Sequence, residues 1–160
     1  MIKTQISNHQ SPISALIPKI ALIGICSLFF YLSSCSTKSP KFQQYFAQGQ
    51  ALYEKNCSNC HQKNGKGLGL VYPPLAVSDY FDKNFNASLC LMKYGTKGEI
   101  IVNGKKFNKP MPGVPSLTAL EVAEIATYIG NTWGRHQGMV EITQASAALT
   151  ACEGKESLTR

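Results

Sequence analysis

Two cysteines and a histidine lie within five positions of one another, as Cys57-Ser58-Asn59-Cys60-His61. Two thiols at this spacing can each form a thioether with one of the two vinyl groups at a haem edge. The histidine that follows directly is then held beneath the iron, where a ring nitrogen can bind it. The motif therefore predicts Cys57 and Cys60 as attachment points for a c-type haem and His61 as an iron ligand.

The same residues could instead contribute to a zinc site that has a distant fourth ligand. Structural zinc sites usually combine one C-x-x-C pair with a second, separated pair of ligands. The sequence has no second pair at such a spacing. The cysteine spacing therefore favours haem over zinc.

The residues before this motif predict a helix from near Pro40 to about Lys55. A glycine inside its apolar face costs roughly 1 kcal/mol relative to alanine, and the close approach of another helix would compensate. We therefore expect a second helix to cross at Gly49 and Tyr53. The apolar residues on this face are Tyr45, Phe46, Gly49, Leu52 and Tyr53.

A second strong helix is predicted from Thr118 to Gly134. Thr118 and Glu121 have the spacing of a capping box, and Tyr128 and Ile129 are expected to meet the glycine face of the first helix. The apolar residues recur with helical period: Val122, Ile125, Ala126, Ile129 and Trp133.

Gly49-x-x-Leu52-Tyr53 followed by the Cys57–His61 motif resembles the N-terminal helix and haem box of class I c-type cytochromes. Residues 118–134 resemble the C-terminal helix of that family. The resemblance implies an all-α fold in which three to five helices surround one covalently bound haem c. It covers residues 42–134, which we expect to form one cytochrome c domain.

The sequence Asn-Lys-Pro-Met-Pro-Gly over 108–113 resembles the loop that carries the distal methionine in this family. Flanking prolines limit backbone freedom and can present the Met111 thioether from a stiff loop. Met92 falls in a predicted helix and Met139 beyond the last core helix, so both are interpreted as packing residues. A His/Met pair is the expected ligation of an electron carrier, and Met111 is therefore the predicted sixth ligand.

Tyr72-Pro73-Pro74-Leu75 is similar to a P-x-L segment of the same family. The resemblance implies that a proline carbonyl accepts the proton on the second ring nitrogen of the haem histidine and fixes the orientation of the ring. Pro73 matches this position, although the doubled proline leaves the register open by one residue.

Several short elements are expected between the two long helices. Residues 78–85 predict a turn and a short helix, and Asn86 is a suitable N-cap for a helix that Gly95 ends. Asn103-Gly104 is a strong hairpin signal, so a small β-hairpin is predicted over residues 99–107.

The N-terminus has the features of an export signal over residues 1–34. Lys3 and Lys19 supply positive charge before an apolar run of 13 residues, Ile20 to Leu32. A transmembrane helix needs about 20 apolar residues, whereas a run of this length suits a signal peptide.

This run ends in Leu32-Ser33-Ser34-Cys35, which resembles the bacterial lipobox. In proteins with that box, cleavage occurs just before the cysteine, which carries lipid. Several acyl chains give stable membrane anchoring, so we predict lipidated Cys35, a tether over residues 35–41 and a domain in the periplasm. The alternative is an uncleaved or ordinarily cleaved signal in which Cys35 has no special role; Cys26 is interpreted as an apolar residue of the signal.

Two cysteines of the exported part have no role in either the haem motif or the lipobox-like sequence. Disulfides persist in exported proteins, so we hypothesise that Cys90 and Cys152 are joined. This bond would fasten a C-terminal extension, residues 135–160, to the domain. The alternative is a pair of free buried thiols, because sequence does not give the Cα separation.

The chain carries a formal charge of +7. Removing residues 1–34 takes away Lys3 and Lys19 and no acidic residue, which leaves +5. Lysines near the expected ligands could steer acidic redox partners, or simply keep the surface soluble. The sequence shows no nucleic-acid-reading motif. The lysines concerned are Lys63, Lys66, Lys105, Lys106 and Lys109.

Together these features predict a membrane-anchored electron carrier, and not an enzyme. With His61 and Met111 both on the iron, no small-molecule substrate could reach it, and electrons would pass to redox protein partners. The alternative is a peroxidase-like haem enzyme or gas sensor with an open sixth position. Such an enzyme or sensor needs a distal acid or base. The only other histidine of the exported part is His136, and because it follows the last core helix, a distal role for it is hard to arrange.

Overall fold

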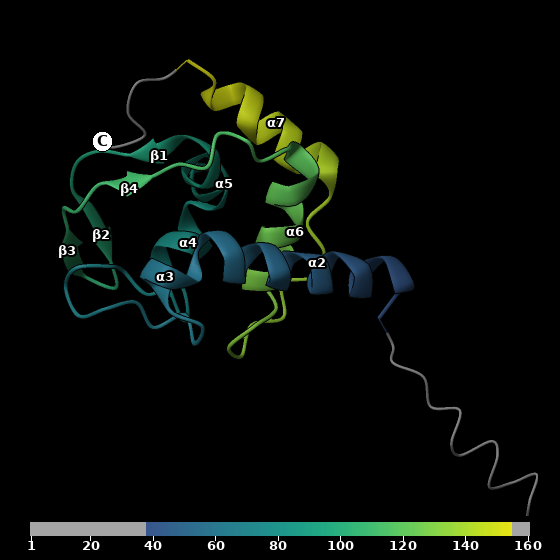
Figure 1. Ribbon diagram of the computed structural model, residues 1–160, viewed down its shortest axis with the longest axis horizontal. Coiled ribbons are helices and arrows are strands. Elements are labelled where there is room, and N and C mark those ends of the chain that lie inside the picture. Colours follow the sequence, from purple (N-terminus) through teal and green to yellow (C-terminus); the bar gives the residue numbers. More distant parts are fainter. Residues whose placement is uncertain (1–37, 155–160) are drawn as a thin grey trace, which may run out of the picture. The chain divides into compact units, whose positions relative to one another are not determined.

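The computed structural model describes residues 38–154 of the 160-residue chain. The predicted all-α class is confirmed, with two small antiparallel strand pairs beside the helices (Figure 1). The described helices are α2 (Pro40–Asn56), α3 (Ser58–His61), α4 (Asp79–Lys83), α5 (Phe85–Tyr94), α6 (Ala119–Ile129) and α7 (Ile142–Cys152). The described strands are β1 (Gly95–Thr96), β2 (Ile100–Val102), β3 (Lys105–Phe107) and β4 (Met111–Pro112).

Six described helices exceed the three to five expected, because α3 and α4 are single turns of 4 and 5 residues. The predicted signal peptide, residues 1–34, and Cys35 lie outside the described residues. None of the helices within residues 38–154 is long and apolar enough to cross a membrane.

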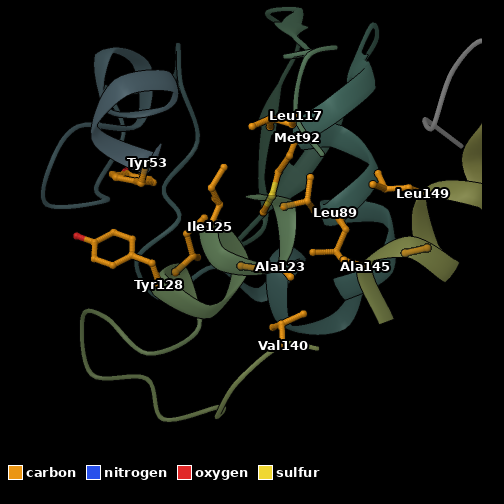
Figure 2. Close-up of a cluster of buried hydrophobic side chains, with 14 of the residues drawn as sticks. Tyr53, Leu89, Met92, Leu117, Ala123, Ile125, Tyr128, Val140, Ala145 and Leu149 are labelled. Carbon is orange, nitrogen blue, oxygen red and sulfur yellow. The ribbon is translucent and has the colours of Figure 1, made fainter. Parts of the chain in front are cut away.

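Helix α2 packs across α6 (Figure 1). This is the helix crossing that was predicted from the glycine in the apolar face of the first helix. A Cβ atom at Gly49 would lie 2.0 Å from the carbonyl oxygen of Glu124. Beside this contact the rings of Tyr53 and Tyr128 have centroids 5.3 Å apart, and Figure 2 shows them next to Ile125. The two helices therefore touch backbone to backbone at Gly49, with aromatic side chains filling the space beside the crossing.

The start of α6 agrees with the sequence, whereas its end does not. The hydroxyl of Thr118 accepts a hydrogen bond of 3.2 Å from the backbone N–H of Glu121, and the Glu121 carboxylate accepts one of 2.8 Å from the Thr118 N–H. This is the predicted capping box. The helix ends at Ile129 rather than at the predicted Gly134.

The early end of α6 has a local cause. The side chains of Asn131 and Thr132 donate hydrogen bonds of 2.8 and 2.6 Å to carbonyl oxygens in the last turn. Carbonyls in the last turn of a helix have no partner inside the helix. Because side chains satisfy them here, the backbone can end its helical course at this point. The turn that follows brings Trp133 onto the aromatic cluster between α2 and α6.

Helix α5 starts one residue before the position expected for its cap. Asn84 is the N-cap and Asn86 lies within the helix, so the prediction of Asn86 as the cap was wrong. The ring of Phe85 packs edge-on against Phe81 of α4, with centroids 5.4 Å apart. Gly95 ends the helix as predicted.

The hairpin at residues 99–107 is confirmed. Strands β2 and β3 pair with Val102 opposite Lys105. Asn103 and Gly104 between them have φ of 51° and 73°, as the turns of two-residue hairpins require. Asn103 and Asp79 exchange two backbone-to-side-chain hydrogen bonds of 2.6 and 3.0 Å, which fix the hairpin against α4.

Helix α7 packs against α5 and α6. It begins at Ile142 and ends at Cys152, within the predicted C-terminal extension. Ala145 and Leu149 are buried, and Figure 2 shows them on the same side of the cluster as Leu89 of α5.

A disulfide between Cys90 and Cys152 joins α5 to α7, with Cα atoms 6.3 Å apart. Both residues are only 4% exposed. The structure therefore contains the bridge and not the alternative pair of free thiols. The bond closes a loop of 62 residues, for which chain entropy gives about 4 kcal/mol of stabilisation.

Gly49→Ala should destabilise the folded protein, although alanine favours helices in general. The added Cβ would meet the Glu124 carbonyl oxygen, which is backbone and cannot move aside cheaply. We expect a loss of about 1–3 kcal/mol in the free energy of unfolding, measured by denaturant titration of the haem-containing protein. The control is Gln50→Ala at the neighbouring exposed position, which should change stability little. Equal stability of Gly49→Ala and wild type would contradict the backbone contact.

Candidate haem site

The joint between α2 and α3 presents the Cys57–His61 motif. The N–H of Cys57 donates to the Tyr53 carbonyl at 2.9 Å, so the cysteine continues the hydrogen bonding of α2. The N–H of His61 donates to the Cys57 carbonyl at 3.0 Å, which closes one further turn. Cys57 and Cys60 are partly exposed free thiols. The end of a well-anchored helix thus carries both thiols and the histidine.

Three adjoining cavities lie next to this turn, and His61 and Met111 line every one of them. The structure therefore brings together the predicted proximal and distal residues, which are fifty positions apart in the sequence. Cys57 lines two of the cavities and Cys60 lines two. The largest of the three cavities by volume has many apolar side chains in its lining, including Leu75, Phe81, Leu91, Ile100, Val102 and Ile129.

His61 is 6% exposed, and its Nδ1 lies 2.9 Å from the carbonyl oxygen of Pro73. This is the contact that the resemblance implies, and it involves Pro73 and not Pro74. Burial lowers the pKa of His61, and the hydrogen bond to Pro73 opposes that shift. Because a carbonyl can only accept, the neutral ring carries its proton on Nδ1. Its Nε2 lone pair is then available for a metal ion.

The loop that carries Pro73 is held by backbone hydrogen bonds and by one aromatic ring. The carbonyl of Gly65 accepts from the N–H groups of Leu75 and Ala76 at 2.7 and 2.9 Å. Gly65 has φ of 66°, and a Cβ there would lie 2.7 Å from the ring of Trp133. The loop thus closes against the segment that follows α6.

Arg135 supports the same loop, and sequence analysis did not identify it. Its guanidinium donates to the carbonyl oxygens of Leu75 and Ser78 at 2.8 and 2.9 Å and to the Asp82 carboxylate at 3.1 Å. The side chain is 9% exposed. No local pattern marks this arginine, because its partners lie more than fifty residues earlier in the chain.

Met111 lies in β4, which pairs with β1 directly after α5. Thr96 is opposite Met111, and Gly95 is opposite Pro112. A Cβ at Gly95 would lie 2.4 Å from the Met111 carbonyl oxygen, so the two backbones approach as closely as glycine permits. Two residues per strand give no alternating pattern, and this pairing was missed at the sequence level.

Met92 is a second methionine near the site. It is 7% exposed and belongs to the hydrophobic core, as predicted. It also lines two of the three cavities beside Met111. Its backbone carbonyl accepts the N–H of Val114 at 3.0 Å, which ties the segment after Met111 to α5.

Burial raises the pKa of the Cys57 thiol to about 12, with a smaller contribution from Cys60. The thiol therefore stays protonated at neutral pH. Two unbonded thiols, a neutral imidazole and a thioether around apolar cavities fit a covalently held haem. No group of three His, Cys, Asp or Glu side chains within residues 38–154 is placed to hold a metal ion, so nothing there supports the zinc alternative.

His136 does not contribute to this site. It is exposed and lines none of the three cavities. The distal acid or base that a peroxidase-like site needs is therefore not supplied by the residue considered for it.

Comparisons with known proteins identify a family that matches this chain. The family model described as Cytochrome c matches residues 46–133. Two curated proteins named Cytochrome c-552, both from Thermus thermophilus, are each 34% identical to this chain over 92 residues. Each alignment covers 55% of this chain, and it covers 70% of the first relative and 62% of the second.

Proposed function

The chain belongs to the cytochrome c family as a class I member with one covalently bound haem c, and we propose that His61 and Met111 would be the two protein ligands of its iron. Cys57 and Cys60 hold the haem through thioether bonds. The observation that carries this proposal is that His61 and Met111 line all three cavities beside the two thiols.

Bound haem c supplies reversible one-electron exchange at its iron. The residues of the chain set the conditions for this exchange. The Pro73 carbonyl fixes the orientation of His61, and the Met111 thioether favours ferrous iron. Apolar cavity walls disfavour the additional positive charge of ferric iron. A site closed on both sides transfers electrons through the haem edge and binds no substrate at the iron.

We place this carrier at a bacterial membrane, held by lipid on Cys35, with its domain in the periplasm. The lipobox-like sequence 32–35 supports the anchor. The carrier acts either freely or as the cytochrome subunit of a respiratory or dehydrogenase complex. In both cases its partners are other redox proteins.

One lysine, Lys109, lines a cavity that Cys60 also lines and supports an acidic partner. Lys109 lies over the ring of Tyr72 at 4.7 Å, and both line the cavity that Cys60 lines. Lys63 and Lys106 are paired with Glu54 and Glu99 at 3.4 and 3.0 Å. Of the five lysines considered, these two are therefore partly neutralised, and Lys109 is the best placed to steer a partner.

Met111→Ala should open the sixth coordination position. Wild-type ferrous protein should bind carbon monoxide slowly and weakly, whereas the variant should bind it rapidly. The loss of the thioether should also lower the reduction potential. Absorption after rapid mixing with carbon monoxide measures the first effect, and Met139→Ala is the control. Rapid binding by wild type would favour the alternative haem enzyme or gas sensor.

Cys35→Ala should release the protein from the membrane. Without lipid, the exported domain retains its haem motif but lacks the acyl chains that are proposed to hold it at the membrane. Cell fractionation followed by haem staining measures the distribution. Wild-type protein in the soluble fraction, or an unmodified Cys35 by mass spectrometry, would contradict the lipid anchor.

Lys109→Gln should slow electron exchange with an anionic iron complex and weaken its dependence on ionic strength, because attraction between charges speeds encounter at low salt. Lys41→Gln is the matched control. Lys41 precedes Cys57 by 16 positions along α2, about 24 Å of helix. Stopped-flow rates against salt concentration measure both. Equal effects of the two variants would contradict steering at the edge near Cys60.

A further inference from the structure

The hydroxyl of Thr96 is buried without a hydrogen-bond partner. Thr96 is 7% exposed, and its Oγ1 has no donor or acceptor within reach in the described part of the chain. A buried hydroxyl that stays unpaired costs free energy. Buried polar groups in folded proteins almost always have a partner, so this one calls for a partner that forms in the haem-containing protein.

The strand register places Thr96 directly opposite Met111. Side chains of directly opposed residues in an antiparallel pair project from the same face, with Cβ atoms roughly 4.5–5.5 Å apart. Thr96 and Met111 also line the same cavity, together with Cys60 and His61. The unpaired hydroxyl and the thioether proposed as ligand therefore share one wall of the haem site.

The remaining walls of this cavity offer few other partners. The Tyr72 ring faces the Lys109 ammonium at 4.7 Å, and the Pro73 carbonyl already accepts from His61. Most of the other lining side chains are apolar: Ile100, Phe107, Pro110 and Pro112. Among the residues that line this cavity, Met111 is the one directly opposite Thr96 in the strand pair, and its sulfur is able to accept a hydrogen bond.

We propose that the Thr96 hydroxyl donates a hydrogen bond to the Met111 sulfur in the haem-containing protein. This inference rests on the proposed ligation of iron by Met111. A thioether sulfur that gives one lone pair to iron keeps a second lone pair, which is a weak acceptor. The bond satisfies the buried hydroxyl and holds the methionine side chain in one orientation.

This hydrogen bond has a direct effect on the iron. It draws electron density from the sulfur, so the sulfur donates less to the metal. Ferric iron depends on that donation more than ferrous iron does, and the bond therefore favours the reduced state. Thr96 acts through Met111 and is a positioning residue for the ligand.

Thr96→Val tests the inference, because valine keeps the size and removes the hydroxyl. At a fixed solution potential, the ratio of ferrous to ferric protein should fall about two- to threefold, as expected for a hydrogen bond at the weak end of the usual range. The sulfur-to-iron charge-transfer band of the ferric protein should shift in energy. Thr96→Ser retains a hydroxyl and should restore both properties toward wild type.

Thr127→Val is the matched control, because Thr127 is also buried, its hydroxyl donates to the Ala123 carbonyl at 2.8 Å, and it lines none of the three cavities. It should leave the redox ratio and the band unchanged. A wild-type band with no shift in Thr96→Val would overturn the hydrogen bond while leaving Met111 ligation intact. A redox ratio that depends on pH, with an unmoved band, would assign the hydroxyl to a haem carboxylate and overturn the inference. Absence of the band in wild type would overturn the ligation and the inference together.

Discussion

The contact between the backbones of α2 and α6 is the constraint on which the site depends. Because Gly49 has no Cβ, α2 can rest on the Glu124 carbonyl, and this contact fixes the helix that ends at Cys57. The haem motif begins at the C-cap of this helix and continues into the single turn of α3. Apolar and aromatic packing between the two helices therefore fixes the end of α2 that leads to both thiols and His61, and the Pro73 carbonyl then orients the His61 ring.

The part of the site that carries Met111 is organised around α5. Strand β1 follows α5 directly and pairs with the strand of Met111, while the Met92 carbonyl binds the chain just beyond it. The Cys90–Cys152 bond fastens α5 to α7, which lies outside the matched family region, residues 46–133. Helix α7 thus supports α5, which leads directly into the strand that pairs with the strand of Met111.

Features with a local chemical signal could be predicted from sequence, such as the capping box at Thr118 and the turn at Asn103-Gly104. The crossing at Gly49 could also be predicted, because a glycine in an apolar helix face needs a reason. The β1–β4 pairing and the contacts of Arg135 could not. Their partners are distant in sequence and leave no periodicity, and the end of α6 depends on side-chain hydrogen bonds after the last apolar residue.

The central claim is that Met111, and not the neighbouring Met92, completes a closed site with His61. Proton NMR of the reduced, diamagnetic protein tests it most directly, because the haem ring shifts the methyl resonance of a bound methionine far upfield. Replacing each methionine in turn assigns that resonance. We predict one such resonance that disappears in Met111→Leu and persists in Met92→Leu. Its assignment to Met92, or the absence of any strongly shifted methionine methyl, would contradict the account.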